Sequence, residues 1–177
     1  MNKVLKEILS NLLFLLVVFG LTFLFITFVA QRTEVSGQSM EPTLHDKDSL
    51  LVDKISYRFS DPKRFDVVIF PYQYGDGQYF IKRLIGLPGE RVRIDEDGHI
   101  FINGELLDEN YGAEIILDPG RAATEITLGD DEFFVLGDNR NHSMDSRDVS
   151  VGNVHRSVIM GKAFVRIFPF SAFGGID

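Results

Sequence analysis

The chain has 177 residues, a formal net charge of −8 at pH 7, and neither cysteine nor tryptophan. The missing cysteines exclude disulfides, thiolate metal sites and a cysteine nucleophile, and the acidic balance argues against general nucleic-acid binding, which uses Lys and Arg to displace phosphate counterions. The mean hydropathy of +0.04 is that of an ordinary soluble domain, but the apolar residues are unevenly spread.

The first long apolar segment predicts a membrane anchor. No charged residue occurs between Glu7 and Arg32, and residues 12–30 are almost entirely apolar. A helix of about 20 apolar residues spans the roughly 30 Å hydrocarbon core of a bilayer and satisfies its own backbone hydrogen bonds there. We therefore predict a cytoplasmic tail at residues 1–7 and a transmembrane anchor at residues 8–31.

Two other interpretations of this segment stay open. A cleaved secretory signal needs small residues before its cut site, and Phe28 is bulky where a cut after Ala30 would need a small residue. A buried core helix would lack a polar face for solvent. Positive charges flank both ends of the segment. A short tail opposite residues 32–177 favours a cytoplasmic N-terminus and a catalytic domain on the outer face of the cell membrane.

Residues 32–177 show the pattern of a mainly β domain. Short runs rich in Val, Ile, Leu and Phe are separated by Gly, Pro and Asp, which is typical of strands and turns. These runs are residues 49–55, 65–70, 79–85, 133–136 and 158–168. Residues 91–94 and 99–102 predict a hairpin, and Asn103 and Gly104 a second tight turn. We expect an all-β domain with folded-over, barrel-like sheets, in which residues 95–130 form a loop-rich noncatalytic insertion.

Ser39 lies in a segment with the features of a nucleophile loop. It follows Gly37 and precedes the X-Pro step at Glu41 and Pro42. The backbone is therefore expected to turn sharply there and to point the Ser39 N–H into a cleft. The alternative is a membrane-exit loop in which Ser, Gly and Pro serve only as turn formers.

Lys82 is the candidate general base. In strand alternation it shares one face with Phe80 and Leu84, while Arg83 faces the other way. A lysine on an apolar face usually extends to water, but it can serve as the base for a serine when burial lowers its pKa. Lowering that pKa from 10.4 to about 8 costs roughly 3 kcal/mol, which desolvation can supply. Ser39 and Lys82 thus form the simplest dyad in the chain.

A third candidate element, residues 137–147, follows the predicted strand at residues 133–136. Asp138, Asp145 and Arg147 could form a bidentate carboxylate–guanidinium network that holds this loop. The alternative is a solvated loop with weak surface ion pairs.

The histidines predict no metal site, because none of them has metal-type spacing. They are His45, His99, His142 and His155. A Ser-His-Asp arrangement of Ser143, His142 and Asp145 can be imagined, but such triads are assembled from distant segments. We expect no metal and no cofactor.

The three elements, in this order behind an N-terminal anchor, resemble the boxes of the type I signal peptidases. These are membrane-bound Ser/Lys serine endopeptidases that remove signal peptides from exported preproteins. The matching segments are residues 36–44, 82–89 and 137–147, with Asp48 in a further short box and residues 158–169 as the closing strand.

The resemblance implies a role for each matched residue. Ser39 would be the nucleophile that forms an acyl-enzyme, and Lys82 the general base. Ser143 would orient the lysine amine, and Met40 would pack against it. The backbone N–H of Ser39 would be one oxyanion donor. The architecture of the site would be held by Asp138, Asp145 and Arg147.

One departure concerns Gly37, which stands where one branch of the family places a serine whose hydroxyl is the second oxyanion donor. Its absence resembles the Gram-positive-type branch and leaves that donor unassigned. The implied partners are preproteins with small residues before the cut, membrane lipid and the nearby secretion translocon, and no nucleic acid.

Two rival functions remain. A self-cleaving Ser/Lys repressor peptidase would need a DNA-binding N-terminal domain, where this chain has an apolar segment. A membrane-anchored non-enzyme on the same fold would be expected to have lost Ser39 or Lys82, and both are present.

Overall fold

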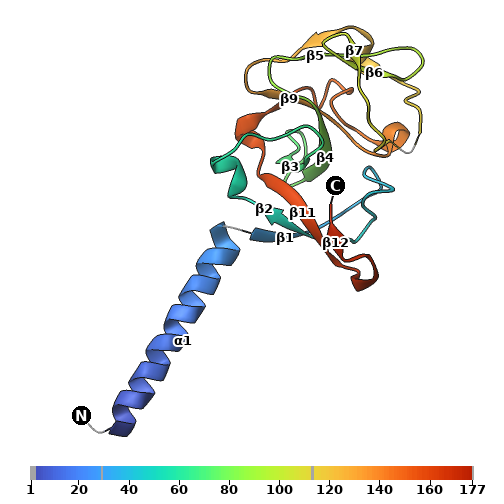
Figure 1. Cartoon of the computed structure of the whole chain (residues 1–177). Helices are drawn as coiled ribbons and strands as arrows, with labels where there is room; N and C mark the ends of the chain where they lie inside the picture. The colour runs from blue at the N-terminus through green and yellow to red at the C-terminus, as the bar shows by residue number, and fades with distance from the viewer. Residues whose placement is uncertain (1–2, 29, 113, 177) are drawn as a thin grey trace.

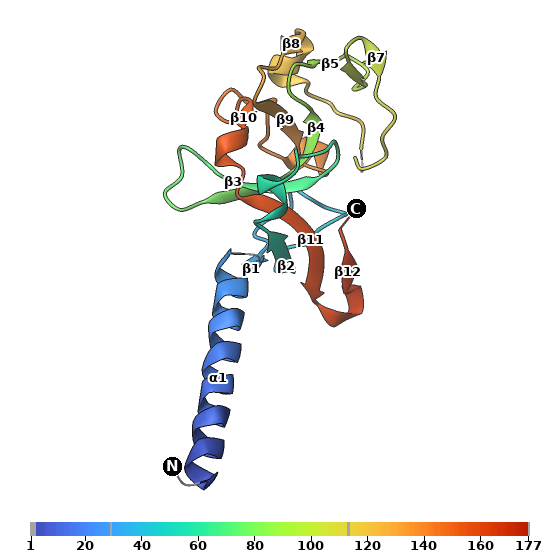
Figure 2. The same ribbon diagram turned by 60° about the vertical axis from the view of Figure 1, so that its left-hand side comes forward.

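One long helix projects from a β-rich domain in the computed structural model, which describes residues 3–28, 30–112 and 114–176. The helix is α1 (Lys3–Phe28), and Figures 1 and 2 both show it extending away from the domain. Within Lys3–Phe23 an 18-residue window has a mean hydropathy of 2.1, and none of it is buried. A core helix of a soluble protein would be buried, so length, composition and exposure fit a membrane anchor.

The larger sheet is antiparallel, with the order β1-β2-β11-β3-β4-β9-β10 and with β12 paired to β11. Its strands are β1 (Ala30–Glu34), β2 (Ser49–Asp53), β3 (Val67–Pro71), β4 (Tyr79–Gly86), β9 (Glu132–Leu136), β10 (Val154–His155), β11 (Gly161–Phe168) and β12 (Gly174–Gly175). Because β11 lies between β2 and β3, the C-terminal part of the chain joins the strands on either side of it.

The smaller sheet lies at the end of the domain away from α1 (Figures 1 and 2). Its order is β7-β6-β5-β8. The strands are β5 (Arg91–Ile94), β6 (Ile100–Ile102), β7 (Glu105–Leu106) and β8 (Ile126–Thr127). Gly98 and Gly104 take φ values of +81° and +86°, which glycine adopts without strain, and they allow the two tight turns that the sequence predicts.

Short 3₁₀ helices connect several strands. They are η1 (Ser56–Arg58), η2 (Gly120–Ala123), η3 (Arg140–His142), η4 (Arg156–Val158) and η5 (Phe170–Ala172). After α1, the described residues contain no α-helix, in agreement with the lack of a sustained 3.6-residue apolar period.

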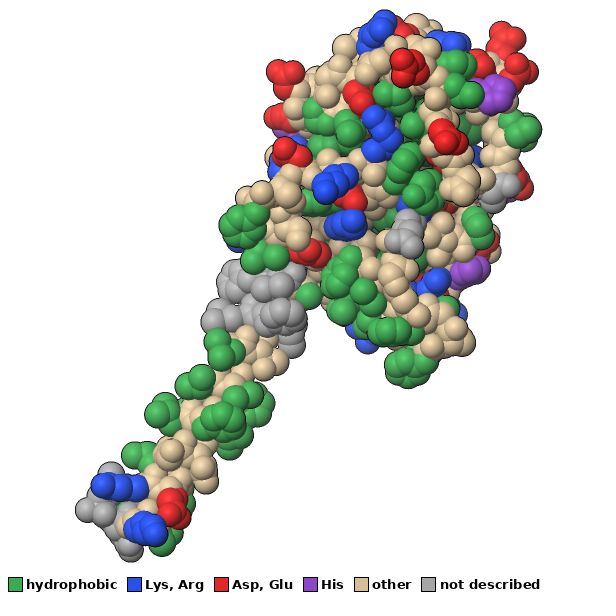
Figure 3. Space-filling model, viewed as in Figure 1, with side chains coloured by type: hydrophobic (Ala, Val, Ile, Leu, Met, Phe, Trp, Pro, Cys, Tyr) green, Lys and Arg blue, Asp and Glu red, His purple; other side chains and the backbone are tan. Residues whose placement is uncertain are grey.

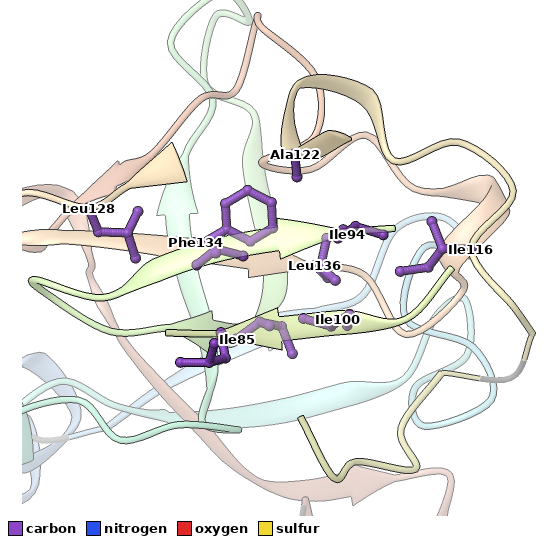
Figure 4. Close-up of a cluster of buried hydrophobic side chains, with 10 residues drawn as sticks. Ile85, Ile94, Ile100, Ile116, Ala122, Leu128, Phe134 and Leu136 are labelled. Atoms are coloured by element: carbon purple, nitrogen blue, oxygen red, sulfur yellow. The ribbon is translucent and has the colours of Figure 1, made fainter. Parts of the chain in front are cut away.

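The hydrophobic core joins the two sheets. In the cluster of Figure 4, Ile85 and Phe134 from the larger sheet pack with Ile94 and Ile100 from the smaller one. A second cluster, around β2 and β3, includes Met40 from the loop before β2. Burial of these side chains stabilises the strands that carry the candidate site.

The mainly β fold behind a single N-terminal helix is confirmed, although the larger sheet is open: among the described strands, β1 and β10 do not pair to close a barrel. The run expected at residues 158–168 becomes a strand only at Gly161, because η4 takes up its first residue. The structure also contains β1, a polar strand that includes Ala30 and Gln31 and is held by its pairing with β2.

Candidate active site

The loop between β1 and β2 presents Ser39. The ends of the loop are held together, because the Val35 N–H donates to the Asp48 carbonyl at 2.8 Å. Gly37 has a φ of +97°, which disfavours any side chain at that position. Met40, directly after the serine, is 2% exposed and belongs to the second core cluster. Sheet and core together therefore fix the position of the serine.

Lys82 lies in β4 and is only 3% exposed. Its Nζ lies 2.7 Å from Oγ of Ser39, although the two residues are 43 positions apart in the chain. The same Nζ donates to the Ile81 carbonyl at 3.0 Å and lies 4.9 Å from the centre of the Phe80 ring. The fold thus brings the two residues of the predicted dyad within hydrogen-bond distance, with few other polar contacts to the amine.

Burial lowers the pKa of Lys82 from 10.5 to about 8, because desolvation penalises the ammonium form. The carboxylates of Asp145 and Asp138 act in the opposite direction and raise this pKa. The amine is therefore neutral in a useful fraction of molecules at mildly basic pH. A neutral amine at this distance can accept the proton of the Ser39 hydroxyl.

A cavity of about 560 Å³ opens at Ser39 and Lys82. Its walls come from the end of β1 and the serine loop, from the β3–β4 hairpin with β4, and from Met144. A volume in this range suits a ligand of several residues or a small organic molecule.

The loop after β9 closes over the serine. The Asn139 N–H donates to the Ser39 carbonyl at 3.1 Å, and the Asn139 side-chain amide donates to the Gln38 carbonyl at 3.1 Å. Ser143 lies in the same loop, and its Oγ is buried without a hydrogen-bond partner among the described residues. The hydrogen bond from Ser143 to Lys82 that the resemblance implies is therefore not formed here.

Asp145 and Arg147 form a bidentate pair, with Nε and Oδ1 2.8 Å apart and Nη2 and Oδ2 2.9 Å apart. Asp145 also accepts the Gly137 N–H at 3.1 Å. Arg147 donates to the carbonyls of Asp118, at 3.1 Å, and Arg140. The pair therefore joins the two ends of the loop and connects it to a neighbouring segment.

Asp138 does not join that pair and instead binds Arg83. The Nε–Oδ1 and Nη2–Oδ2 distances are 2.9 and 2.7 Å, and both side chains are fully buried. Arg83 follows Lys82 in β4 but faces the opposite side of the strand. The single network expected of Asp138, Asp145 and Arg147 is thus two separate pairs, and one of them ties the loop to the strand of the lysine.

Two further contacts come from residues that sequence reasoning did not single out. The Tyr111 ring lies 3.7 Å from the Arg83 guanidinium. Glu109 makes a bidentate pair with Arg140 at 2.8 and 2.9 Å. Both belong to the expected insertion at residues 95–130, where no periodicity or motif indicates which side chains fold back onto the site.

Asp48, in the further short box, is buried and paired with Arg166 of β11 at 2.8 Å. It also accepts the His45 N–H at 2.9 Å. Arg166 donates in addition to the Thr43 carbonyl at 3.2 Å. The C-terminal strand therefore holds the end of the serine loop in place.

The four histidines are exposed. In the described part of the chain, the side chain of His142 makes no hydrogen bond to Ser143 or Asp145. The ligand atoms of Asp95, Asp97 and His99 lie within 4.8 Å of one another on the β5–β6 turn. Asp95 accepts the backbone N–H groups of the other two at 3.1 and 2.8 Å, so the hydrogen bonds of the turn account for this grouping.

The sequence of this chain is similar to the sequences of signal peptidases from other organisms. The family model described as signal peptidase, peptidase S26, matches residues 7–168. Signal peptidase I of Leptolyngbya laminosa is 41% identical over 84% of this chain and 73% of its own length. Signal peptidase I of Bacillus amyloliquefaciens is 37% identical over 77% of this chain and 75% of its own length. A crystal structure of a signal peptidase I from Enterococcus faecalis V583 shares 37% identity, covering 58% of this chain and 97% of that one, with a TM-score of 0.48.

Proposed function

The chain belongs to the signal peptidase family, peptidase S26, and removes signal peptides from preproteins; we propose that it does so with Ser39 as nucleophile and Lys82 as general base. The observation that carries this proposal is the 2.7 Å separation of Ser39 Oγ and Lys82 Nζ at the wall of a cavity of about 560 Å³. In the described residues, no other serine or threonine hydroxyl forms a hydrogen bond with a lysine amine.

In the proposed mechanism, the neutral Lys82 amine takes the hydroxyl proton as Ser39 Oγ attacks the scissile carbonyl carbon. The lysine then gives that proton to the leaving amine, and an ester links the serine to the signal peptide. A water molecule, deprotonated by the same amine, hydrolyses the ester and restores the serine. The lowered pKa of Lys82 supports this cycle, because a base must be neutral at working pH to accept a proton.

The neighbouring residues have supporting roles in the proposal. Ser143 orients the Lys82 amine during the reaction, and Met40 excludes water from it. Two buried pairs hold the loop against the dyad, Asp138 with Arg83 and Asp145 with Arg147.

The backbone N–H of Ser39 is proposed as one donor to the oxyanion, since the serine loop turns at this residue. The second donor has no assignment, because Gly37 has no hydroxyl to offer. No metal or cofactor takes part in the proposed reaction.

The substrate is proposed to be an extended preprotein segment with small residues at the first and third positions before the cut. An extended segment can pair with an exposed strand edge beside the cavity. Ser39 follows the first residue of β1, Ala30, by only nine positions, so the cavity lies near the membrane exit. A substrate whose own apolar segment is still in the bilayer could reach it there.

The proposed topology is a cytoplasmic tail at residues 1–7, a membrane anchor at 8–31 and a catalytic domain at 32–177 on the outer face of the cell membrane. The exposed apolar helix supports anchoring to the membrane. The orientation, the nearness to a translocon and the noncatalytic nature of residues 95–130 are parts of the proposal.

The test is cleavage of a preprotein by the full chain in detergent. Ser39→Ala and Lys82→Ala should each lower kcat/KM by at least about 100-fold, because each removes a reacting group. Ser60→Ala and Lys63→Ala change the same residue types at exposed positions and serve as matched controls. Unchanged cleavage by either dyad variant would exclude the proposed mechanism.

A membrane-anchored non-enzyme is separated by a fluorophosphonate probe, which reacts with an activated serine. Labelling of the parent chain, and none of Ser39→Ala, is the expected result. Equal labelling of both would mean that Ser39 is not the reactive serine.

A further inference from the structure

A second cavity, of about 230 Å³, lies between η1 with the loop that follows it and η4 with the start of β11. Three of its lining residues are cationic: Lys54, Arg58 and Arg156. The others are Tyr57, Pro62, Ile159 and Met160, so no carboxylate lines the cavity. None of these residues has a part in the proposed cleavage reaction.

Two of the three cationic side chains of this cavity have no hydrogen-bond or ion-pair partner among the described residues. Among the described residues, the side chains of Lys54 and Arg58 make no hydrogen bond or ion pair. Arg156 is held in place because its Nη2 donates to the carbonyls of Tyr57 and Ser60, at 3.0 and 3.2 Å. A fixed guanidinium beside two free cations is an arrangement that recognises a phosphate-type anion.

The nearby carboxylates are engaged elsewhere or easily displaced. Asp53 accepts the N–H groups of Ile55 and Ser56, at 2.9 and 3.0 Å, and so is engaged at the start of η1. Asp61 lies 3.2 Å from Arg156, but its side chain is 93% exposed, so this is a weak surface ion pair. The chain as a whole carries a net charge of −8, so this cationic cavity stands out against an acidic background.

The position of the cavity relative to α1 places it near the membrane surface. The helix ends at Phe28, β1 begins at Ala30, and Ala30 pairs with Asp53, the residue before Lys54. Since paired strands lie about 5 Å apart and successive Cα atoms about 4 Å, Lys54 is on the order of 10 Å from the membrane exit. Lipid headgroups occupy that level of the bilayer. Figures 1 and 2 show β2 next to the end of α1.

We infer that this cavity binds the phosphate of an anionic membrane lipid. The cationic residues face the phosphate, and the apolar walls at Pro62, Ile159 and Met160 face the glycerol part of the lipid. In Figure 3, Lys and Arg side chains on the face of the domain above the helix lie beside apolar side chains and some Asp and Glu side chains.

A lipid bound in this cavity holds the cavity at Ser39 close to the membrane surface. A small hollow of about 90 Å³ lies between the two cavities. It shares Lys54 and Met160 with the cationic cavity and Thr33 and Tyr79 with the cavity at Ser39. A lipid headgroup held at Lys54 therefore keeps the β1–β2 edge, and with it Ser39, at the membrane surface.

A single tryptophan tests this inference, since the chain has none. Phe59→Trp places the reporter directly after Arg58, at a side chain that is 83% exposed. The full chain is reconstituted through α1 into vesicles of phosphatidylcholine and phosphatidylglycerol, with bromine on one lipid at a time as a contact quencher. Brominated phosphatidylglycerol should quench at least about twofold more than brominated phosphatidylcholine at equal mole fraction.

Lys54→Gln with Arg58→Gln should bring that quenching ratio to about one, because both free cations are removed. The control is Arg91→Gln with Arg93→Gln in β5, which removes two charges at the far end of the domain and should leave the ratio unchanged. Arg156 is kept because it supports η1. Inorganic phosphate, at matched ionic strength, should not displace the lipid preference.

Equal quenching by the two lipids, an unchanged ratio in the Lys54/Arg58 variant, or the same fall in the control variant overturns the inference. Loss of the preference in inorganic phosphate assigns the cavity to free phosphate and also overturns it. Preprotein cleavage in detergent should be the same in all variants. This readout distinguishes failure of the lipid site from failure of the Ser39/Lys82 proposal.

Discussion

Gly137 passes so close to Ser143 that no side chain fits between them. A Cβ at position 137 would lie 2.2 Å from Oγ of Ser143 and 2.4 Å from the carbonyl oxygen of Ser39. Both distances are far shorter than a van der Waals contact. The glycine at the exit of β9 is therefore what allows the loop carrying Ser143 to approach Ser39.

Gly137→Ala should displace this loop and lower kcat/KM by about 100-fold, since a misplacement near 1 Å at a reacting group has effects of that size. Preprotein cleavage and thermal unfolding in detergent check both activity and folding. Gly174→Ala is the control, because a Cβ there meets nothing within 4 Å. A fully active Gly137→Ala enzyme would show that the loop tolerates displacement.

The pH dependence of cleavage should report the lowered pKa of Lys82. The amine accepts a proton only when neutral, so kcat/KM should rise with pH and level off above about 8. An ordinary lysine would give a rise that continues past about 10. Initial rates between pH 6 and 10 with a stable peptide substrate measure the midpoint.

An NMR titration of Lys82 in Ser39→Ala gives the same pKa without catalysis. Because the pKa of Lys82 is about 8 in the folded chain and 10.5 in the unfolded chain, the unfolded chain binds more protons at this residue between about pH 8 and pH 10.5. The contribution of Lys82 to the free energy of unfolding should therefore rise with pH over this interval. A midpoint near that of a solvated lysine would contradict the role of burial.

The proximity of Ser39 and Lys82 is predictable because two local signals agree. Strand alternation places Lys82 among apolar neighbours, and the turn residues around Ser39 predict a sharply turned loop that faces a cleft. The partner of Asp138 was not predictable in the same way. Arg83 lies 55 positions away, and the strand pairing of β4 with β9 brings the two together.

The polar strand β1 shows another limit of sequence reasoning. Its residues, AQRTE, lack the apolar alternation that indicates a strand. Pairing with β2, from Ala30 with Asp53 to Glu34 with Ser49, holds this segment in an extended conformation. The sequence does not predict the contact of Tyr111 with Arg83 either, because this contact depends on how an irregular segment folds back onto β4.

Asp138→Ala should destabilise the domain strongly. The change leaves the Arg83 guanidinium buried without its counterion, which costs about 3–5 kcal/mol of unfolding free energy. Glu125→Ala breaks the exposed pair with Arg91 and should cost less than about 1 kcal/mol. Denaturant unfolding in detergent compares the two. Equal costs would mean that Arg83 finds another partner or reaches water.

Ser143→Ala separates an orienting role from a structural one. Among the described residues the Ser143 hydroxyl has no partner, so its removal should leave the free energy of unfolding within about 1 kcal/mol of the parent. If the hydroxyl holds the Lys82 amine during the reaction, kcat should still fall by about tenfold or more. An unchanged kcat together with an unchanged pH profile would remove Ser143 from the mechanism.

Tyr111 tests whether the segment at residues 95–130 is noncatalytic. Its ring stacks on Arg83 at 3.7 Å and lies 4.9 Å from the Phe65 ring. Tyr111→Ala should lower the free energy of unfolding by about 2–4 kcal/mol, whereas Tyr111→Phe keeps the stack. The control is Phe101→Ala, whose ring lies 4.5 Å from the Arg93 guanidinium. Arg93 is only half-buried, whereas Arg83 is fully buried, so the loss at Phe101 should be smaller.

Activity measurements distinguish a structural role of Tyr111 from an effect on the cleavage reaction. With the folded fraction measured, kcat/KM of Tyr111→Ala per folded molecule should stay within about threefold of the parent, because the ring stacks on Arg83, which faces away from Lys82 in β4. A large fall in kcat/KM with unchanged stability would mean that this segment acts on the dyad through Arg83. Because Arg83 adjoins Lys82 on the opposite face of β4, such an effect would also shift the pH midpoint of cleavage, which the structural role alone leaves unchanged.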